Sequence, residues 1–446
     1  MSSSVRRRKC SKEKDASSSS KGSKRICVPI EREEYGRILA EDTAFRECLD
    51  MMIERHPEIF PSAIQQGYRL HGTLPPSKKM PDVRMRRIKM KEKDDDGKQQ
   101  VFTIAPSFVM SYMTGYTDDV ENALFLRRFG VPYWALTHVF GHDDMYWQRL
   151  EERLGRNSIV GTTIKDPDKL PEDLLADEKH TRLNGEKAYI ATTVGADCVL
   201  GASVALQADE KNLKEAYGHF KTEAQNLSAD YKPKTVNIDG WRATWLAWQS
   251  LFSSITIIVC FLHAFIKIRA RCKRMKERFS EICQQVWDVY HAADKQTFME
   301  KIEDLRIWAS ENVETGAGLD VILNLCDKAP EFLKAYDHPS AYRTSNMIDR
   351  HMEPMDRYLY SGKYFHGHLM MAEYRVRGWV LLHNFQPYYP RSKVASEYIT
   401  PAHKLNGFVY HDSWLQNLLV SASMGGHRRL PQKTLEPGIC NSHLFS

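Results

Sequence analysis

The stretch AYIATTVGADCVLGASVALQ, residues 188–207, decides the fold class, because here the apolar pattern changes from a period of 3.6 to a period of two. Two runs rich in strand-forming residues, AYIATTVG and CVLGASVALQ, lie on either side of Ala196 and Asp197. Strand-like runs separated by a two-residue turn predict a β-hairpin. The stretch therefore predicts two paired strands of a larger sheet.

Helices and strands alternate downstream of this hairpin. Residues 212–227 predict an amphipathic helix, and KTVNIDG (234–240) predicts a short strand that ends in an acid. ITIIVC (255–260) predicts a buried strand, followed by a long basic helix from His263 to about Val286. This order of elements is typical of a mixed α/β sheet, so we expect an α+β protein.

Further helices are predicted toward the C-terminus. Residues 279–333 have a helical pattern nearly throughout and predict an all-α block. Residues 346–360 predict a helix that returns to the sheet, and HDSWLQNLL (411–419) predicts another. We therefore expect the sheet-forming region to be interrupted by a helical insertion.

The segment before residue 117 predicts a smaller mixed region. Residues 31–54 predict a helix, and the proline-rich segment from Pro57 to Pro76 predicts a loop. Residues 83–91 predict a basic strand that pairs back, across the turn DDDGK, with residues 101–104.

Residues 117–156 have the pattern of a helix-turn-helix. Gly130-Val131-Pro132 ends a first helix and begins a second over 133–140, and Asp143 caps a third over 145–154. The third helix of such a motif enters the major groove of DNA, although any bundle of three helices with short turns has this pattern. The residues on it that we expect to contact bases or phosphates are Trp147, Gln148, Arg149, Arg153 and Arg156.

The composition indicates a largely globular protein of about two or three domains. Of the 446 residues, 42% are hydrophobic and 11% aromatic, which suffices for sizeable packed cores. The nine cysteines include no CxxC pair, which favours reduced thiols over a disulfide framework. No apolar segment predicts a signal peptide, and the longest apolar run, 255–266, is too short to span a bilayer.

The positive charge is concentrated at the N-terminus. Residues 1–28 hold nine Lys or Arg and two Asp or Glu, about +7, so the rest of a chain of net charge +6 is near −1. This serine-rich segment has no apolar periodicity, and we expect a disordered basic tail over residues 1–30. Such a tail suits non-specific binding to nucleic-acid phosphates, or is a solvated extension without a defined role.

Three acids occupy positions where a metal site can be built. Asp177 follows a short apolar run, Asp239 ends the strand TVNID, and Asp349 lies in the first turn of the helix over 346–360. Carboxylate oxygens are the ligands that hard cations prefer, and two such ions can hold both the attacking and the leaving oxygen in a phosphoryl displacement. Each acid alone is also explained as a turn residue or a helix-terminal residue.

Four motifs surround these acids: ADEKH (176–180), NIDGWRATWLAW (237–248), VCFLH (259–263) and TSNMIDR (344–350). They resemble motifs of the DDE/D transposases, especially the Mutator-like branch and related bacterial insertion-sequence enzymes. The resemblance extends over about half of the chain, from Asp177 to about Phe385. The resemblance implies a ribonuclease-H-like core with a helical insertion, and two Mg²⁺ or Mn²⁺ ions held by Asp177, Asp239 and Asp349.

The third acid departs from the family pattern, in which most relatives have Glu. An Asp side chain is one methylene shorter, so either Asp349 is the ligand of a DDD variant, or Glu353 one turn later is the ligand, or the enzyme is impaired. The neighbouring Asn346 and Arg350 match the motif and favour Asp349.

The resemblance also implies supporting residues around the acids. Cys260 and His263 form the C-x-x-H pair that these enzymes have after the second acid. The pair is a poor structural zinc site because a second pair of ligands is missing, and His263 is equally explained as a core histidine. His180, three residues after Asp177, is a further candidate for positioning water or phosphate. The residues of the basic helix that we expect to follow a DNA backbone are Lys267, Arg271, Arg274 and Arg278.

The sequence therefore predicts a DNA transposase that binds transposon ends, cuts beside them and joins the 3′-hydroxyls to target DNA. Its partners would be double-stranded DNA and a second copy of the chain, in the cytoplasm or nucleoid, or in the nucleus of a eukaryotic host. A nuclease on the same fold and a non-catalytic DNA-binding protein are the alternatives. The expected regions are a basic tail (1–30), a DNA-binding region (31–165), a catalytic core (166–278 and 340–395), a helical insertion (279–339) and a C-terminal extension (396–446).

Overall fold

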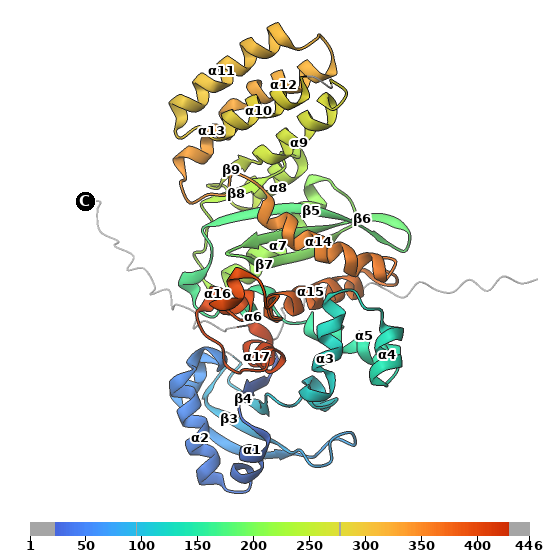
Figure 1. The fold of residues 1–446 in the computed structure, drawn as a ribbon. Coiled ribbons are helices and arrows are strands. Elements are labelled where there is room, and N and C mark those ends of the chain that lie inside the picture. Colours follow the sequence, from blue (N-terminus) through green and yellow to red (C-terminus); the bar gives the residue numbers. More distant parts are fainter. Residues whose placement is uncertain (1–22, 95, 276–277, 428–446) are drawn as a thin grey trace, which may run out of the picture.

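The computed structural model describes residues 23–94, 96–275 and 278–427. It contains two mixed β-sheets and many helices, which confirms the α+β class. The helical block lies at one end of the molecule, the larger sheet in the middle and the smaller sheet at the other end (Figure 1). Of the tail expected over residues 1–30, residues 1–22 lie outside the described residues.

The larger sheet has five strands in the order β7-β6-β5-β8-β9. Strands β5, β6 and β7 are antiparallel neighbours, whereas β8 and β9 run parallel to β5. The predicted hairpin is confirmed, with Ala196 and Asp197 both at positive φ in the turn. The strands are β5 (Asp173–Leu183), β6 (Glu186–Gly195), β7 (Cys198–Ala205), β8 (Thr235–Ile238) and β9 (Thr256–Val259).

Helices cover both faces of this sheet. The helices α7 (Glu210–Leu227) and α8 (Arg242–Leu251) pack against the face that carries Ala176. The helices α14 (Asn346–Ser361) and α15 (Leu369–Phe385) pack against the opposite face, which carries Leu175. Because side chains alternate along a strand, this arrangement puts even-numbered residues of β5 under α7 and odd-numbered ones under α14.

The edge strand β7 is buried along its whole length because α7 covers one of its faces and α15 the other. Asn384 of α15 accepts a hydrogen bond from the Val199 N–H (3.1 Å) and donates one to the Val199 carbonyl (2.8 Å). Glu373 of the same helix accepts from the Val204 N–H at 2.7 Å. These side chains satisfy the backbone groups that an edge strand otherwise leaves open for pairing.

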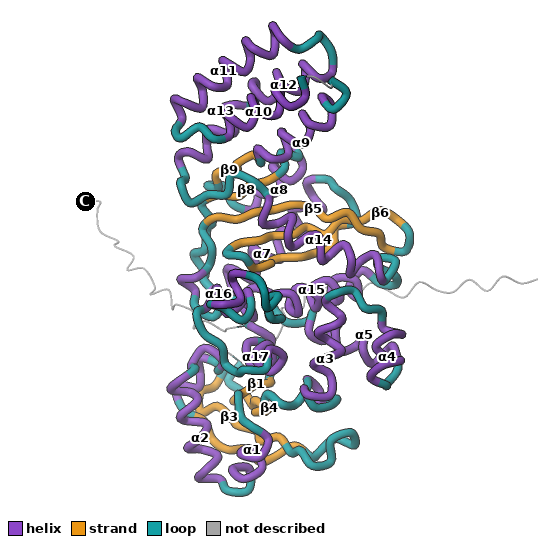
Figure 2. Tube along the Cα trace, viewed as in Figure 1, coloured by secondary structure: helices purple, strands orange, loops and turns teal. Residues whose placement is uncertain are grey.

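The helical block follows β9 and has its own core (Figure 2). The expected basic helix from His263 to Val286 is wrong in extent, because α9 ends at Cys272 and the next helix begins at Phe279. Its elements are α9 (Phe261–Cys272), α10 (Phe279–Tyr290), α11 (Lys295–Asn312), α12 (Ala317–Asp327), α13 (Ala329–Leu333) and the 3₁₀ turn η5 (Lys334–Asp337).

The smaller sheet has the order β1-β4-β3-β2, with β1 parallel to β4. Three expectations were wrong here: residues 25–28, assigned to the tail, form β1; residues 68–74, inside the expected loop, form β2; and the single helix expected over 31–54 is divided at residues 40 and 41 into α1 and α2. The elements are β1 (Arg25–Val28), α1 (Arg32–Leu39), α2 (Asp42–Arg55), η1 (Pro57–Ile59), η2 (Ser62–Gln66), β2 (Tyr68–Leu74), β3 (Met85–Lys93) and β4 (Gln99–Pro106).

A group of three helices connects the two sheets, as the helix-turn-helix pattern predicts. The side chain of Asp143 accepts from the Tyr146 N–H at 2.7 Å and so caps the third of them, α5. The elements are η3 (Ser111–Met113), α3 (Thr117–Arg128), α4 (Tyr133–Phe140), α5 (Asp144–Leu154), α6 (Ile159–Thr163) and η4 (Pro167–Lys169).

The C-terminal segment packs between the smaller sheet and α15 (Figure 1). Gln416 accepts a hydrogen bond from the Ser107 hydroxyl at 2.7 Å, and Ser423 accepts one from the Cys27 N–H at 3.1 Å. The segment therefore joins the two ends of the described part of the chain. Its elements are η6 (Lys393–Ser396), α16 (Pro401–Asn406), α17 (Trp414–Ser421) and η7 (Ser423–Gly426).

Candidate active site

Asp177 lies on β5, the middle strand of the larger sheet, and faces α14. One carboxylate oxygen accepts a hydrogen bond from the Glu178 N–H at 2.8 Å. Burial raises the pKa of the Asp177 carboxyl, and the charges of Asp239 and Asp349 raise it further, whereas His263 lowers it. Four segments that are far apart in the sequence therefore meet closely enough for their charges to interact.

Asp239 follows the last residue of β8, the strand next to β5. Gly240 has a φ of +88°, a conformation that residues with a Cβ rarely adopt, and it turns the chain from β8 toward α8. The Trp241 N–H donates to the Asp239 carboxylate at 2.7 Å. The turn thus fixes the second acid beside the first, because β5 and β8 are parallel and pair Leu175 with Asn237, and each acid lies two residues further along its chain segment.

Asp349 lies in the first turn of α14, on the same side of the sheet as Asp177. Its carboxylate accepts a hydrogen bond from the Ser345 hydroxyl at 3.0 Å. Glu353, the alternative third acid, is exposed one turn later and forms an ion pair with Arg357. Asp349, and not Glu353, is thus the acid whose charge acts on Asp177.

Cys260 and His263 join the same cluster. Cys260 precedes α9, and its sulfur accepts a hydrogen bond from the Ser345 N–H at 3.2 Å. A hydrogen bond with Cys260 raises the pKa of His263 to about 9, with further increases from the charges of Asp177 and Asp239. Burial opposes ionisation of the Cys260 thiol, but hydrogen bonds with His263 and Ser345 lower its pKa. Cys260 and the acids therefore favour the protonated form of this imidazole.

Two of the expected supporting residues lie apart from this cluster, whereas a third, Asn346, begins the helical turn that carries Asp349. His180 is on the opposite face of β5 from Asp177 and is exposed, with its ring 5.1 Å from that of Tyr189. Arg350 is exposed, with its guanidinium 3.9 Å from the Asp197 carboxylate in the β6–β7 turn. Asn346, the first residue of α14, is exposed.

One buried acid was missed by the sequence analysis. Glu178 lies under α7 and α8, where its carboxylate accepts hydrogen bonds from the hydroxyls of Tyr217 and Thr244, each at 2.7 Å. Burial raises the pKa of Glu178 to about 7, although the two hydroxyls lower it and Asp177 raises it further. Its position next to Asp177 on a strand was the available signal, because alternation puts it on the other face.

The expected DNA contacts on α5 divide into two groups. Trp147 was wrongly assigned, because it is buried and its indole N–H donates to the Gly141 carbonyl at 3.0 Å. Gln148 is half-buried and donates to Glu152 at 2.7 Å. The other three residues line one pocket at the surface: Arg149, Arg153 and Arg156.

The basic residues of α9 follow His263, which belongs to the acid cluster, along the same helix. His263, Lys267 and Arg271 are four residues apart, so they share one face of this helix. Lys267 and Arg271 are exposed, as is Arg274 beyond the helix end. Arg278 is bonded to Asn312 at 3.0 Å and lies 3.8 Å from Glu281. Within the described part of the chain, no carboxylate forms an ion pair with Lys267, Arg271 or Arg274.

The donor set fits a hard divalent cation in kind but is not arranged as a finished metal site. Within residues 23–94, 96–275 and 278–427, no group of three or more His, Cys, Asp or Glu side chains stands close enough to hold a metal ion. Each of the three aspartates has one oxygen engaged by a donor of its own segment, as described above. The second oxygen of each is the group that would contact a cation.

No model of a known protein family matches the chain, and no curated protein is significantly similar to it in sequence. Among the described residues, no helix is both long and apolar enough to cross a membrane. The candidate site therefore depends on its own geometry and on the resemblance of its four motifs.

Proposed function

We propose that this protein is a DNA transposase of the DDE/D type, built on a ribonuclease-H-like core. The larger sheet supports the proposed core: three antiparallel strands continue into two parallel ones, and the acid-bearing β5 lies in the middle. The helical block between β9 and α14 corresponds to the insertion that the resemblance implies. The smaller sheet and the three-helix group would form the DNA-binding region.

The observation that carries the proposal is the meeting of three acids from β5, the end of β8 and α14 on one face of the sheet. Burial raises the pKa of Asp177, and the like charges of Asp239 and Asp349 raise it further, so such a cluster is more typical of a functional site than of a structural one. The acids are also the ones that the four motifs predict.

Asp177, Asp239 and Asp349 would hold two Mg²⁺ or Mn²⁺ ions. When bound, such ions activate a water for attack on a phosphodiester and stabilise the leaving oxygen. The three carboxylates would turn from their present hydrogen bonds toward a common centre. The protonated His263 would offset part of their charge, and Ser345 would orient Asp349 through its hydroxyl.

The exposed cations near the acids suit a DNA backbone. Lys267 and Arg271 extend along α9 from His263, and their side chains point away from the block's core. Phosphate contacts of this kind position a duplex without reading its sequence. A second copy of the chain is part of the proposal, because joining two transposon ends requires a complex that holds both.

The experiment that tests the proposal is cleavage and joining by the purified full-length chain, with the DNA that naturally flanks its gene as substrate. Wild type in Mg²⁺ or Mn²⁺ is expected to cut and to yield joined products. Asp177→Asn, Asp239→Asn and Asp349→Asn are expected to bind the same DNA but to lose at least about a thousandfold in rate. Glu353→Gln, the matched control on α14, is expected to keep wild-type activity.

Each other outcome selects a different function. Cleavage without joined products would make the protein a nuclease on the same fold. Equal binding by all variants, with no metal-dependent product from wild type, would make it a non-catalytic DNA-binding protein.

A further inference from the structure

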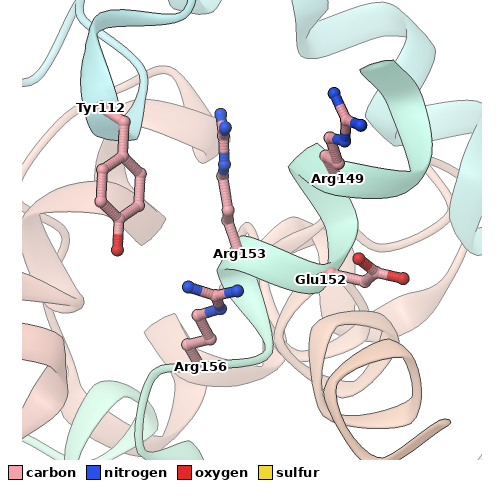
Figure 3. A pocket seen from close by; sticks show the side chains of 5 residues that line it. All are labelled: Tyr112, Arg149, Glu152, Arg153 and Arg156. Atoms are coloured by element: carbon pink, nitrogen blue, oxygen red, sulfur yellow. The ribbon is translucent and has the colours of Figure 1, made fainter. Parts of the chain in front are cut away.

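A pocket of about 340 Å³ opens beside α5, away from the acid cluster's segments. Figure 3 shows the Arg153 side chain between Tyr112 and Arg149, with Arg156 below it. The pocket is lined by Tyr112, Arg149, Glu152, Arg153 and Arg156. Its volume is at the lower end of the range typical of small-ligand sites, about 300–1,000 Å³.

The three arginines form a concentrated positive charge. Arg149, Arg153 and Arg156 are four and three residues apart, so their side chains share one face of α5 and its C-terminal end. Burial lowers the pKa of Arg153, and the charges of Arg156 and Arg149 lower it further. Within the described chain, none of the three forms an ion pair with a carboxylate. An anion bound among them would relieve this repulsion.

Glu152 also lines the pocket, but its carboxylate is engaged elsewhere. It accepts a hydrogen bond from the Gln148 amide at 2.7 Å, and in Figure 3 it points away from the three arginines. It therefore neutralises the pocket only in part.

Tyr112 gives the pocket an aromatic wall. Its side chain is 67% exposed, and the Arg153 guanidinium carbon lies 5.1 Å from the ring centroid. Tyr112 and the next residue, Met113, both have positive φ (63° and 51°), a conformation that costs energy for residues with a Cβ. Strained backbone of this kind is concentrated at functional sites, and here it presents an aromatic ring to solvent beside three cations.

We propose that this pocket binds one unpaired nucleotide of the DNA substrate, with its phosphate on the arginines and its base stacked on Tyr112. A duplex backbone needs only a flat basic stripe, whereas a pocket with an exposed ring suits a base that has left the helix. Guanidinium groups bind phosphate oxygens through paired N–H donors. The inference rests on the proposed function, because it takes DNA to be the substrate.

The test is fluorescence anisotropy of labelled DNA with the full-length chain in EDTA. Three duplexes are compared: one blunt, one with a short single-stranded overhang, and one whose overhang is abasic. Wild type is expected to bind the normal overhang about tenfold more tightly than the abasic one, since stacking on an aromatic side chain contributes on this scale. Tyr112→Gly, which suits the positive φ, is expected to remove that difference, and Tyr112→Phe to keep it.

Arg153→Ala is expected to weaken binding of both overhangs about tenfold. It should also reduce the slope of the logarithm of the binding constant against the logarithm of the salt concentration by about one, the value for one phosphate contact. The matched controls are Tyr389→Ala, a tyrosine of 66% exposure outside the pocket, and Arg391→Ala, an exposed arginine in the same loop after α15. Both controls are expected to bind as wild type does.

Two results would overturn the proposal: wild type that does not distinguish normal from abasic overhangs, or Tyr112→Gly that keeps the distinction. Both binding measurements are independent of metal binding by the acids, because EDTA removes divalent cations. Cleavage by wild type is measured in parallel with Mn²⁺. If overhang binding depends on Tyr112 but wild type does not cleave DNA, the nucleotide pocket stands and the transposase proposal is refuted. If wild type cleaves DNA but overhang binding does not depend on Tyr112, the transposase proposal stands and the nucleotide pocket is refuted.

Discussion

At the scale of single residues, Asp177 and Glu178 have opposite environments although they are adjacent on β5. Asp177 faces α14 and the other acids, whereas Glu178 is buried beneath α7 and α8 with two hydroxyl donors. The pleat of the strand produces this division, since successive side chains point to opposite faces. One residue is therefore available to a ligand, and the other supports the strand from behind.

Glu178→Gln tests the role of the buried acid in stability. The folded pKa of about 7 exceeds the ordinary value of 4.5, so the folded state binds the proton more tightly. The contribution of Glu178 to stability is fully present below about pH 4.5 and is lost as the pH rises through 7. Wild type should therefore lose up to about 3 kcal/mol relative to Glu178→Gln between pH 5 and pH 8.

The measurement is the free energy of unfolding by denaturant across that pH range. Glu314→Gln, which changes an exposed glutamate in a loop, should follow the wild-type curve. Parallel curves for wild type and Glu178→Gln would contradict the assignment.

At the scale of elements, α5 is held against α15 by two glycines. A Cβ at Gly155 would come within 1.7 Å of the Tyr374 carbonyl oxygen, and one at Gly378 within 2.4 Å of the Glu151 carbonyl oxygen. Only a residue without a side chain permits this approach. The contact decides which face of α5 is buried and leaves Arg149, Arg153 and Arg156 on the surface.

Gly155→Ala is expected to lower the free energy of unfolding by at least about 3 kcal/mol, because backbone must move to admit the methyl group. The control is Gly36→Ala in α1, where nothing lies within 4 Å of the added Cβ. It should instead stabilise the protein by about 0.5–1 kcal/mol. Equal effects of the two substitutions, measured by thermal and denaturant unfolding, would refute this packing.

The elements that depend on local signals could be predicted from the sequence. The hairpin at Ala196-Asp197, the strand of Asp239 and the three helices up to α5 are marked by periodicity, turns and caps. The strand β1 could not be predicted from the sequence, because its four residues lie in a basic segment and pair with β4, which is far along the chain. Trp147 was misassigned because an amphipathic pattern does not tell which neighbour covers a helix.

The candidate site was predictable only in part. The motifs named the three aspartates, Cys260 and His263, which the structure brings together. The flanking Asn346 and Arg350 favoured Asp349 over Glu353, and the structure adds that the charge of Asp349 acts on Asp177 whereas Glu353 forms an ion pair with Arg357. The hydrogen bond from the Ser345 N–H to Cys260 and the burial of Glu178 depend on tertiary packing, which no short motif contains.

At the scale of the whole molecule, the C-terminal segment joins the smaller sheet to the rest. Ser423 accepts from the Cys27 N–H and donates to the Ile59 carbonyl at 2.6 Å, while Gln416 is buried against Ser107. The two ends of the described chain therefore form one packed unit with α15. A residue of α17 can thus control the stability of strands at the start of the chain.

Gln416→Ala is expected to cost about 1–3 kcal/mol, because the buried Ser107 hydroxyl loses its acceptor. Hydrogen exchange should become faster first in β1 and β4, and not in the helical block. The control is Gln284→Ala in α10, which removes an exposed glutamine bonded to Asp288 and should change neither region. Uniform acceleration across the molecule would refute a local role for α17.

The most direct test of the central claim, that three acids form one metal site, is Mn²⁺ binding to the full-length protein measured by calorimetry and by electron paramagnetic resonance. Wild type is expected to show saturable binding that Asp177→Asn, Asp239→Asn and Asp349→Asn each weaken at least about tenfold, because each removes a carboxylate ligand. Glu353→Gln should titrate as wild type does. Wild-type binding that survives all three Asn substitutions, or that Glu353→Gln abolishes, would contradict the claim.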